Sequence, residues 1–360
     1  MTVLLLGSSG PLNLKVVYCL VPLRVRVHLA ATCETNLARR SRHVDAFVVH
    51  PGVSGAGDTG ETIAWLRDYC ARHGIEVVIP GDIGTAGFLA AAAASLEGVL
   101  VYPCSGTDLL DRLHDKWLFA STLMKAGLAT PRTALIATPD DAAPAAAEIG
   151  FPLIVKPLSG ESSHGVLRFD ALDPLIEHVR SGRPYSTPPL IAQQYLHGRD
   201  IDISVLAEHG QVRLAVTQQL ERNGALRFFP DAPTRRLADA IIAEYGYHGV
   251  AHFDMRVDER TGRVSVLECN PRFWYSMPAA MWQGVNFVEA GIRAARGEDP
   301  ARGMHLVPGQ YYLPKALLDA LRRPWKMDGV SLRNLRGVVQ PLLDPAPHFS
   351  DWMHKARGRG

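Results

Sequence analysis

The sequence predicts an α/β protein, and two patterns support this prediction. Short apolar runs alternate with segments of helical length over the first hundred residues, which is typical of an open parallel sheet with helices packed on it. Further along, the stretches 249–257 and 264–273 alternate polar and apolar residues on either side of a turn, which predicts a β-hairpin. At 360 residues the chain is long enough for two or three domains.

Composition excludes several classes of protein. The formal net charge is only +2, with acidic and basic residues mixed throughout, so nothing indicates a nucleic-acid footprint. Five cysteines without CxxC spacing argue against a disulfide framework or a zinc site and favour a reducing cytosol. The sequence contains no run of about 18 uncharged apolar residues, so it predicts no membrane span. The first residues lack the basic region of a signal peptide. We therefore expect a cytoplasmic protein with no nucleic-acid or membrane partner.

The first strand is predicted at Thr2–Leu6 and ends at Gly7-Ser-Ser-Gly10. A glycine-rich turn of this kind can bind a dinucleotide, but the third glycine of GxGxxG is missing and Pro11 stands at the helix opening, so the fingerprint is weak. Later segments follow the same logic of periodicity and stop signals. They predict strands at 25–31, 46–50, 76–79, 99–102 and 212–218 and helices at 108–127 and 233–245.

A candidate phosphate-binding segment follows the apolar run 151–157. Lys156 lies in that run, where a buried ammonium would be costly unless it met an anion. Directly after it, residues 158–166 include Gly160, Gly165 and three serines. The backbone N–H groups of such a loop can surround phosphate oxygens. For the loop by itself, a surface hairpin turn is the alternative.

The hairpin at 249–273 is a candidate metal site. A period of two puts His252, Asp254 and Arg256 on one face and turns Leu267 toward the core with its apolar neighbours. A register with Asp254 opposite Glu268 would set two carboxylates against each other, which is unfavourable unless a cation lies between them. Two carboxylates and an amide carbonyl are the hard oxygen ligands that suit Mg²⁺. The alternative is a solvated polar face of an edge hairpin.

The segment Leu267-Glu-Cys-Asn-Pro-Arg272, after an upstream strand that contains Asp254, resembles the metal-binding signature of the ATP-grasp superfamily. The similarity is greatest to its carbamoyl-phosphate-synthetase-like and carboxylate–amine ligase branches. The resemblance implies an ATP-grasp fold of α/β and α+β type, preceded by a Rossmann-like (pre-ATP-grasp) domain. The implied parts are a first domain at 1–105, an ATP-grasp domain at 106–300 with a lid at 130–195 and a catalytic part at 196–300, and a C-terminal extension at 301–360 that packs on the core and ends in a frayed basic tail.

The same resemblance implies roles for individual residues, in the order in which they would meet MgATP. Lys116 and Lys156 would reach the phosphates, and the loop would cover them. Arg272 and His252 would take part in the chemistry. The loop contacts are Gly160, Ser162, Ser163 and Gly165; the adenine contacts are Gln193, Tyr195 and Leu196; the ribose contact is Asp200; and the ligands of Mg²⁺, with Mn²⁺ as the alternative ion, are Asp254, Glu268 and Asn270. Gln193 departs from the glutamate that is frequent in the family, and Asp202 is assigned only a supporting role in its strand.

The function that the resemblance implies is ATP-dependent ligation of a carboxylate to an amine or amino acid. ATP would phosphorylate the carboxylate, and the amine would attack the acylphosphate to form an amide, releasing ADP and phosphate. The partners would be small-molecule carboxylate and amine substrates, and relatives make a homodimer an expectation by analogy. Two alternatives remain: an ATP-grasp kinase that stops after phosphoryl transfer, and a non-catalytic nucleotide-binding module.

Overall fold

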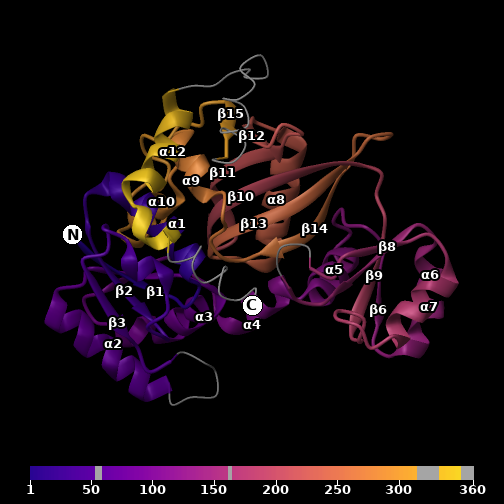
Figure 1. Cartoon of the computed structure of the whole chain (residues 1–360), viewed down its shortest axis with the longest axis horizontal. Helices are drawn as coiled ribbons and strands as arrows, with labels where there is room; N and C mark the ends of the chain where they lie inside the picture. The colour runs from indigo at the N-terminus through magenta and orange to yellow at the C-terminus, as the bar shows by residue number, and fades with distance from the viewer. Residues whose placement is uncertain (53–58, 161–163, 314–331, 350–360) are drawn as a thin grey trace.

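The computed structural model describes residues 1–52, 59–160, 164–313 and 332–349, and their strands form three β-sheets (Figure 1). We refer to them as the N-terminal sheet, the small sheet and the large sheet. Among these residues, no helix combines the length and the apolar character needed to cross a membrane.

The N-terminal sheet is parallel. Its strands are β1 (Thr2–Leu6), β2 (Arg26–Ala31), β3 (Ala46–Val49), β4 (Val77–Pro80) and β5 (Leu100–Val101), in the order β3-β2-β1-β4-β5. The helices in its connections are α1 (Gly10–Leu20), α2 (Thr59–His73) and α3 (Ile83–Ala92), with short 3₁₀ turns at Val21–Leu23, Leu37–Arg40 and Ala93–Ser95. Every residue of β1 is buried, as expected for a central strand covered on both faces. The predicted open parallel sheet is confirmed.

The helix predicted over 108–127 is in fact two helices, α4 (Thr107–His114) and α5 (Lys116–Lys125). The chain is extended at Asp115, whose carboxylate accepts hydrogen bonds from the backbone N–H groups of Trp117 and Leu118, each at 2.8 Å. Asp115 is therefore the N-cap of α5. Lys116 becomes the first residue of that helix, and its backbone N–H donates to the carbonyl of Leu158 at 2.9 Å.

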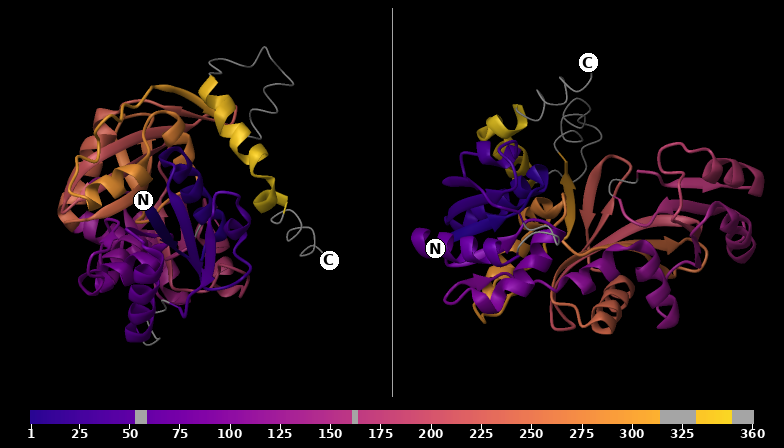
Figure 2. Two further views of the ribbon diagram at one scale, coloured as in Figure 1. Left: turned by 90° about the vertical axis from the view of Figure 1, so that its left-hand side faces the viewer. Right: turned by 90° about the horizontal axis from the view of Figure 1, so that it is seen from below.

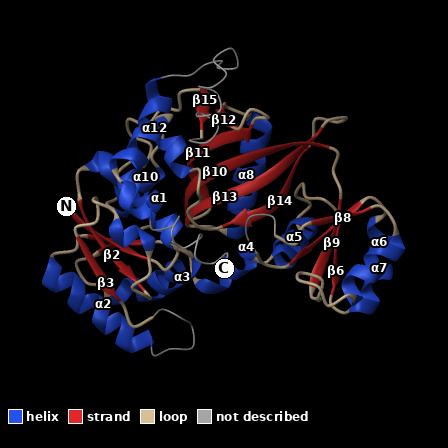
Figure 3. Cartoon of the chain, viewed as in Figure 1, coloured by secondary structure: helices blue, strands red, loops and turns tan. Residues whose placement is uncertain are grey.

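The small sheet is antiparallel and carries its own core. Its strands are β6 (Thr133–Ile136), β7 (Leu153–Pro157), β8 (Leu167–Phe169) and β9 (Leu190–Gln194), in the order β6-β9-β7-β8. Apolar side chains of these strands pack against α6 (Ala142–Ile149) and α7 (Leu172–Arg180), and a 3₁₀ turn at Pro139–Asp141 precedes α6. Helix α5 contacts strands of both the small and the large sheet (Figure 3).

The large sheet is antiparallel and longer. Its strands are β10 (Gly198–Glu208), β11 (Gln211–Leu220), β12 (Ala225–Phe228), β13 (Gly249–Asp258), β14 (Val264–Asn270) and β15 (Gly309–Tyr312), in the order β14-β13-β10-β11-β12-β15. One face packs on α4, α5 and α8 (Ala232–Tyr245) in an apolar core. The predicted hairpin is β13 and β14, and the predicted strand at 212–218 and helix at 233–245 correspond to β11 and α8.

The C-terminal segments join the N-terminal sheet to the large sheet. Helix α1 packs on α9 (Met277–Trp282) and α10 (Phe287–Ala295), and the Tyr102 hydroxyl donates to the carbonyl of Phe287 at 2.8 Å. Helix α12 (Leu332–Leu343) runs beside the N-terminal sheet (Figure 2), where the Ser41 hydroxyl donates to buried Asp344 at 2.6 Å. The predicted basic tail, residues 355–360, lies outside the described residues.

Candidate active site

A cavity of about 440 Å³ lies between the small sheet and the large sheet. Most of the residues implied by the family resemblance line it, from both sheets and from α5. They are Lys116, Lys156, Gly160, Gln193, Tyr195, Leu196, Asp200, Asp254 and Glu268. Four other expected residues, Gly165, His252, Asn270 and Arg272, do not line this cavity. Ser162 and Ser163 lie outside the described residues.

Two buried lysines supply positive charge to the cavity. The Lys116 ammonium lies 3.4 Å from a Glu268 carboxylate oxygen and 3.4 Å from the Gly160 carbonyl. The Lys156 ammonium donates to the Leu267 carbonyl at 3.5 Å, and burial lowers the pKa of Lys156 to about 8. Burial disfavours the charged form of Lys156, and a phosphate oxygen beside the ammonium would favour it again. Lys156 is therefore a candidate ligand for an anion.

The two carboxylates face each other, which is the register considered in the sequence analysis. On β13 and β14, Asp254 pairs with Glu268 and His252 pairs with Asn270. Burial alone would raise the pKa of Asp254, but a hydrogen bond from His252 and the charge of that imidazole lower it to about 2. Burial and the neighbouring Asp254 raise the pKa of Glu268. The pair is thus unevenly ionised, which is the usual result of two carboxylates sharing a buried site.

One expectation for this hairpin was wrong. Leu267 was predicted to point toward the core, but it lines the cavity. The pairing shifts by one residue between Asp254 and Met255, since Met255 pairs with Val266 and Leu267 is left without a partner in the register. Such a β-bulge re-aims the side chains beside it. Sequence alternation alone could not reveal the bulge.

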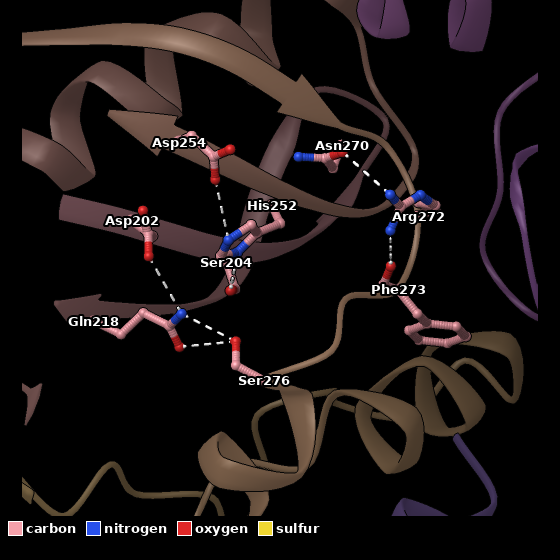
Figure 4. A network of polar contacts seen from close by, with 9 residues as sticks. All are labelled: Asp202, Ser204, Gln218, His252, Asp254, Asn270, Arg272, Phe273 and Ser276. Carbon is pink, nitrogen blue, oxygen red and sulfur yellow. Dashed lines mark hydrogen bonds and ion pairs between the residues drawn. The ribbon is translucent and has the colours of Figure 1, made fainter. Parts of the chain in front are cut away.

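Asp202 is the residue that sequence reasoning missed. It lies on β10 directly opposite Asp254 and lines the cavity, so three carboxylates cross the sheet in one row. Burial raises the pKa of Asp202 to about 6, and Gln218 donates to it at 3.4 Å (Figure 4). The signal was present in the period of two, which sets Asp200 and Asp202 on one face of the same strand.

His252 supports this row from beside the cavity. Its Nδ1 is 2.9 Å from the Ser204 hydroxyl, and its Nε2 is 3.3 Å from an Asp254 carboxylate oxygen (Figure 4). Its ring stacks on Trp274 with centroids 5.4 Å apart and planes 12° apart. Burial would lower the pKa of His252, but hydrogen bonding to Asp254 and the charge of Asp254 and Asp202 raise it. The imidazole therefore orients Asp254, and its ligand atom also lies within 4.8 Å of those of Asp202 and Asp254.

Arg272 lies at the junction with the N-terminal sheet. It donates to the Phe273 carbonyl at 2.9 Å and to the Asn270 side-chain oxygen at 3.4 Å (Figure 4). With Asp82, which follows β4, it lines a separate cavity of about 10 Å³. The guanidinium thus occupies the seam between two sheets, and its contact with Asn270 ties it to the proposed metal ligands.

The residues at the other end of the cavity join the two sheets. Gln193 is buried, and its amide donates to the Thr133 hydroxyl at 3.0 Å. The chain then passes through Tyr195 and Leu196 into β10, where Asp200 forms an ion pair with Arg256 at 2.5 Å. Gln193, Tyr195, Leu196 and Asp200 are therefore brought to one cavity wall.

Comparisons with known proteins agree with this architecture. A family model described as "ATP-grasp in the biosynthetic pathway with Ter operon" matches residues 186–311, and one described as "D-ala D-ala ligase C-terminus" matches residues 125–229. The large chain of carbamoyl phosphate synthase from Agathobacter rectalis is 24% identical over 257 residues, which are 67% of this chain and 23% of that one. A D-alanine–D-alanine ligase from Pseudomonas entomophila is 34% identical over 127 residues, which are 33% of this chain and 38% of that one.

Among solved structures, the biotin carboxylase domain of the 2-oxoglutarate carboxylase from Hydrogenobacter thermophilus, described as a dimer with MgADP and bicarbonate, superimposes with a TM-score of 0.62. The two are 19% identical, and the match covers 86% of this chain and 73% of that one. The fold and the sequence matches agree with the resemblance to the ATP-grasp superfamily, whose family model matches residues 186–311.

Proposed function

We propose that this protein is an ATP-dependent carboxylate–amine ligase that forms an amide bond through an acylphosphate. The observation that supports it best is the pairing of Asp254 with Glu268 in a cavity that also holds two buried lysines. Burial disfavours the charged forms of Lys156 and Glu268 in the protein alone, and all four charges are complementary to parts of MgATP. A ligase of this superfamily and a mere nucleotide sensor differ in Arg272, which a sensor does not need.

The donor set fits magnesium. Asp254, Glu268 and the side-chain oxygen of Asn270 are hard oxygen ligands, and the raised pKa of Glu268 reflects burial and a carboxylate neighbour that a cation would relieve. These three residues would hold the ion, which would supply charge neutralisation of the triphosphate when bound. Manganese has the same ligand preference and is the alternative ion.

The remaining polar groups would each bind a different part of the nucleotide. Lys116 and Lys156 would bind phosphate oxygens, and the loop with Gly160, Ser162, Ser163 and Gly165 would cover them through backbone N–H groups. Gln193, Tyr195 and Leu196 would bind the adenine edge, and Asp200 would accept from the ribose hydroxyls. The amide of Gln193 already donates to Thr133 at 3.0 Å, so its carbonyl oxygen is the part left for the adenine amino group.

The chemistry follows from this placement. A carboxylate oxygen of the acid substrate attacks the γ-phosphorus, the bond to the β-γ bridging oxygen breaks, and ADP leaves. The amine then attacks the acyl carbon, phosphate leaves with the bonding electron pair, and the amine loses a proton. Arg272 would stabilise the transferring phosphoryl group and the later oxyanion, and His252 would hold Asp254 in its ionised, oriented state. Exclusion of water by the covering loop keeps the acylphosphate for the amine.

The domain arrangement completes the proposal. The N-terminal sheet has the strand order 3-2-1-4-5 that begins a doubly wound fold, and we assign residues 1–105 as the pre-ATP-grasp domain that binds the acceptor substrates. Residues 106–300 would form the ATP-grasp domain, and 301–360 the C-terminal extension. The acid and the amine would be small molecules, and a homodimer is part of the proposal by analogy.

An ADP-release screen tests the function directly. The protein would be incubated with MgATP and pairs of amino acids or small carboxylates, with mass detection of the products. A ligase releases ADP only when the acid is present and yields an amide that is one water lighter than its two substrates. Hydroxylamine would trap the acylphosphate as a hydroxamate. ADP with a phosphorylated product and no amide would instead favour a kinase, and no ADP with any acid would contradict both.

A further inference from the structure

The turn that joins the small sheet to the large sheet is held by one arginine from a third strand. Strand β9 ends at Gln194 and β10 begins at Gly198. The guanidinium of Arg256, on β13, donates through Nε to the Leu196 carbonyl at 2.7 Å and through Nη2 to the Gly198 carbonyl at 2.9 Å. Its Nη1 lies 2.5 Å from the Asp200 carboxylate. Each nitrogen of the guanidinium therefore bonds to this turn or to β10, the strand that follows it.

Tyr195 adds a second link across the same turn. The Arg168 guanidinium, on β8 of the small sheet, lies 4.6 Å from the Tyr195 ring centroid, and the Arg256 guanidinium lies 5.6 Å from it. Cation–π contacts at these distances are attractive. Arg168, Tyr195, Asp200 and Arg256 form what we call the hinge clasp, which connects one strand of each sheet to the turn between them.

The clasp has a specific consequence for Asp200. The Asp200 side chain is 71% exposed, so without a partner it would sample several rotamers. Arg256 is its register partner on β13, and the ion pair engages Oδ1. Within the described part of the chain, no group donates to Oδ2. One carboxylate oxygen is therefore fixed by the protein, and the other is presented to the cavity that both residues line.

We propose that Arg256 is a positioning residue for nucleotide recognition: it orders the hinge backbone and holds Asp200 so that Oδ2 accepts a hydroxyl of the nucleotide sugar. This inference rests on the proposed binding of MgATP. A guanidinium presents its donors in a fixed planar fork, and this geometry lets Arg256 hold two carbonyls and a carboxylate at once. Arg256 therefore sets the preference for a sugar that carries hydroxyl groups.

Equilibrium binding by calorimetry tests this role, with MgATP and Mg-2′,3′-dideoxy-ATP as the two probes. The wild-type protein should bind MgATP about tenfold more tightly than the dideoxy nucleotide. A difference of this size corresponds to the loss of one hydrogen bond to a charged group. Asp200→Asn should remove most of this discrimination. Arg256→Gln should also remove most of the preference for MgATP, although Asp200 is retained. The double variant should lose no more of this preference than either single variant does.

The neighbouring Arg199 is the matched control. It lies on β10 and donates to Gln219 at 3.0 Å on an exposed surface, and it does not line the cavity. Arg199→Gln makes the same charge change and should leave the discrimination of the wild type intact. Arg256→Lys keeps the charge but loses the planar set of donors. It should therefore be more thermally stable than Arg256→Gln and still lack the preference for MgATP over the dideoxy nucleotide.

The outcomes separate the two levels of the proposal. If wild-type protein takes up no MgATP, the proposed function is wrong. If it binds MgATP but Arg256→Gln still prefers MgATP over the dideoxy nucleotide as strongly as the wild type, the positioning role of Arg256 is wrong and the proposed function is untouched. Steady-state kinetics should agree, with a raised KM for ATP and a kcat close to that of the wild type in Arg256→Gln.

Discussion

The two ends of the cavity differ in how their charges are balanced. At the hinge end, Asp200 has Arg256 at 2.5 Å, and the arginine also holds two backbone carbonyls. At the phosphate end, Asp254 faces Glu268. Their partners in the protein lie farther away, with Lys116 at 3.4 Å from Glu268 and His252 at 3.3 Å from Asp254. The hydrogen bond of Lys156 within the described residues is to the Leu267 carbonyl at 3.5 Å. The protein alone satisfies the hinge end, whereas the protein balances the phosphate end less closely, with two facing carboxylates and two buried lysines at longer distances. We expect this difference if the hinge end positions the nucleoside and the phosphate end carries out phosphoryl transfer.

The largest expected effect is at the phosphate end. Glu268→Gln should reduce turnover by about a thousandfold or more, because a bound metal stabilises the transferring phosphoryl group by several kcal/mol. Without nucleotide, the same variant should melt close to the wild-type temperature, since removing one of two opposed carboxylates offsets the loss of the ion pair with Lys116. The rate of ADP release measures the turnover, and differential scanning calorimetry without nucleotide measures the melting temperature. Glu208→Gln, which removes a surface carboxylate paired with Arg213, is the control. A strongly destabilised, still active Glu268→Gln would break the comparison.

Arg272→Ala should have the next largest effect. Turnover should fall by about a hundredfold, as when an oxyanion-stabilising donor is lost, while the Kd for MgATP changes by no more than about threefold. The reason is that Arg272 lies at the seam with the N-terminal sheet and does not line the nucleotide cavity. Pre-steady-state kinetics and calorimetry on the same preparation separate these quantities. Near-normal turnover would remove Arg272 from the reaction.

The pH dependence of nucleotide binding sharpens the comparison. Folding lowers the pKa of Lys156 from its ordinary 10.5 to about 8. Between those values the unfolded chain binds more protons than the folded one, so stability without nucleotide should rise as pH increases through this window. A bound phosphate favours the ammonium, so MgATP binding above about pH 8 should take up protons and weaken as pH rises. Calorimetry in buffers of different ionisation enthalpy measures this uptake. It should disappear in Lys156→Met.

The smallest effect is expected at the hinge end. Gln193→Glu introduces the residue that is frequent in the superfamily and should change the Kd for MgATP by about threefold or less, because the Thr133 hydroxyl can turn and donate to the new carboxylate. Titration of both proteins with MgATP checks this. A change of more than a hundredfold would mean that the glutamine sets nucleotide affinity, and the hinge end would then be as sensitive as the phosphate end.

Much of this architecture could be predicted from the chain alone. The runs that became β1 to β5 are apolar segments with clear stops, and the alternation in β13 and β14 put Asp254 on one face with His252, and Glu268 on one face with Asn270. These features depend on local periodicity, which the sequence displays directly. The break at Asp115 was missed, because the apolar periodicity of 108–127 runs across it, although an aspartate before a helical stretch is an N-cap signal.

Other features depend on where strands meet, and no local pattern reports that. Asp202 joined the row of carboxylates because β10 pairs with β13, two strands separated by more than forty residues in sequence. Leu267 turned into the cavity because of a bulge in the pairing. The guanidinium of Arg256 reached the hinge for the same non-local reason. Register and bulges are properties of the assembled sheet, so the positioning residues of the site appear only in the structure.

The measurement that tests the central claim most directly is the magnesium dependence of ATP binding by the wild-type protein and by Glu268→Gln. The account predicts saturable calorimetric uptake of ATP by the wild type with magnesium, and a large loss of affinity when EDTA removes the ion. Glu268→Gln should bind ATP equally weakly in both conditions. Uptake of ATP by the wild type that is the same with and without magnesium, or no uptake at all, would contradict it.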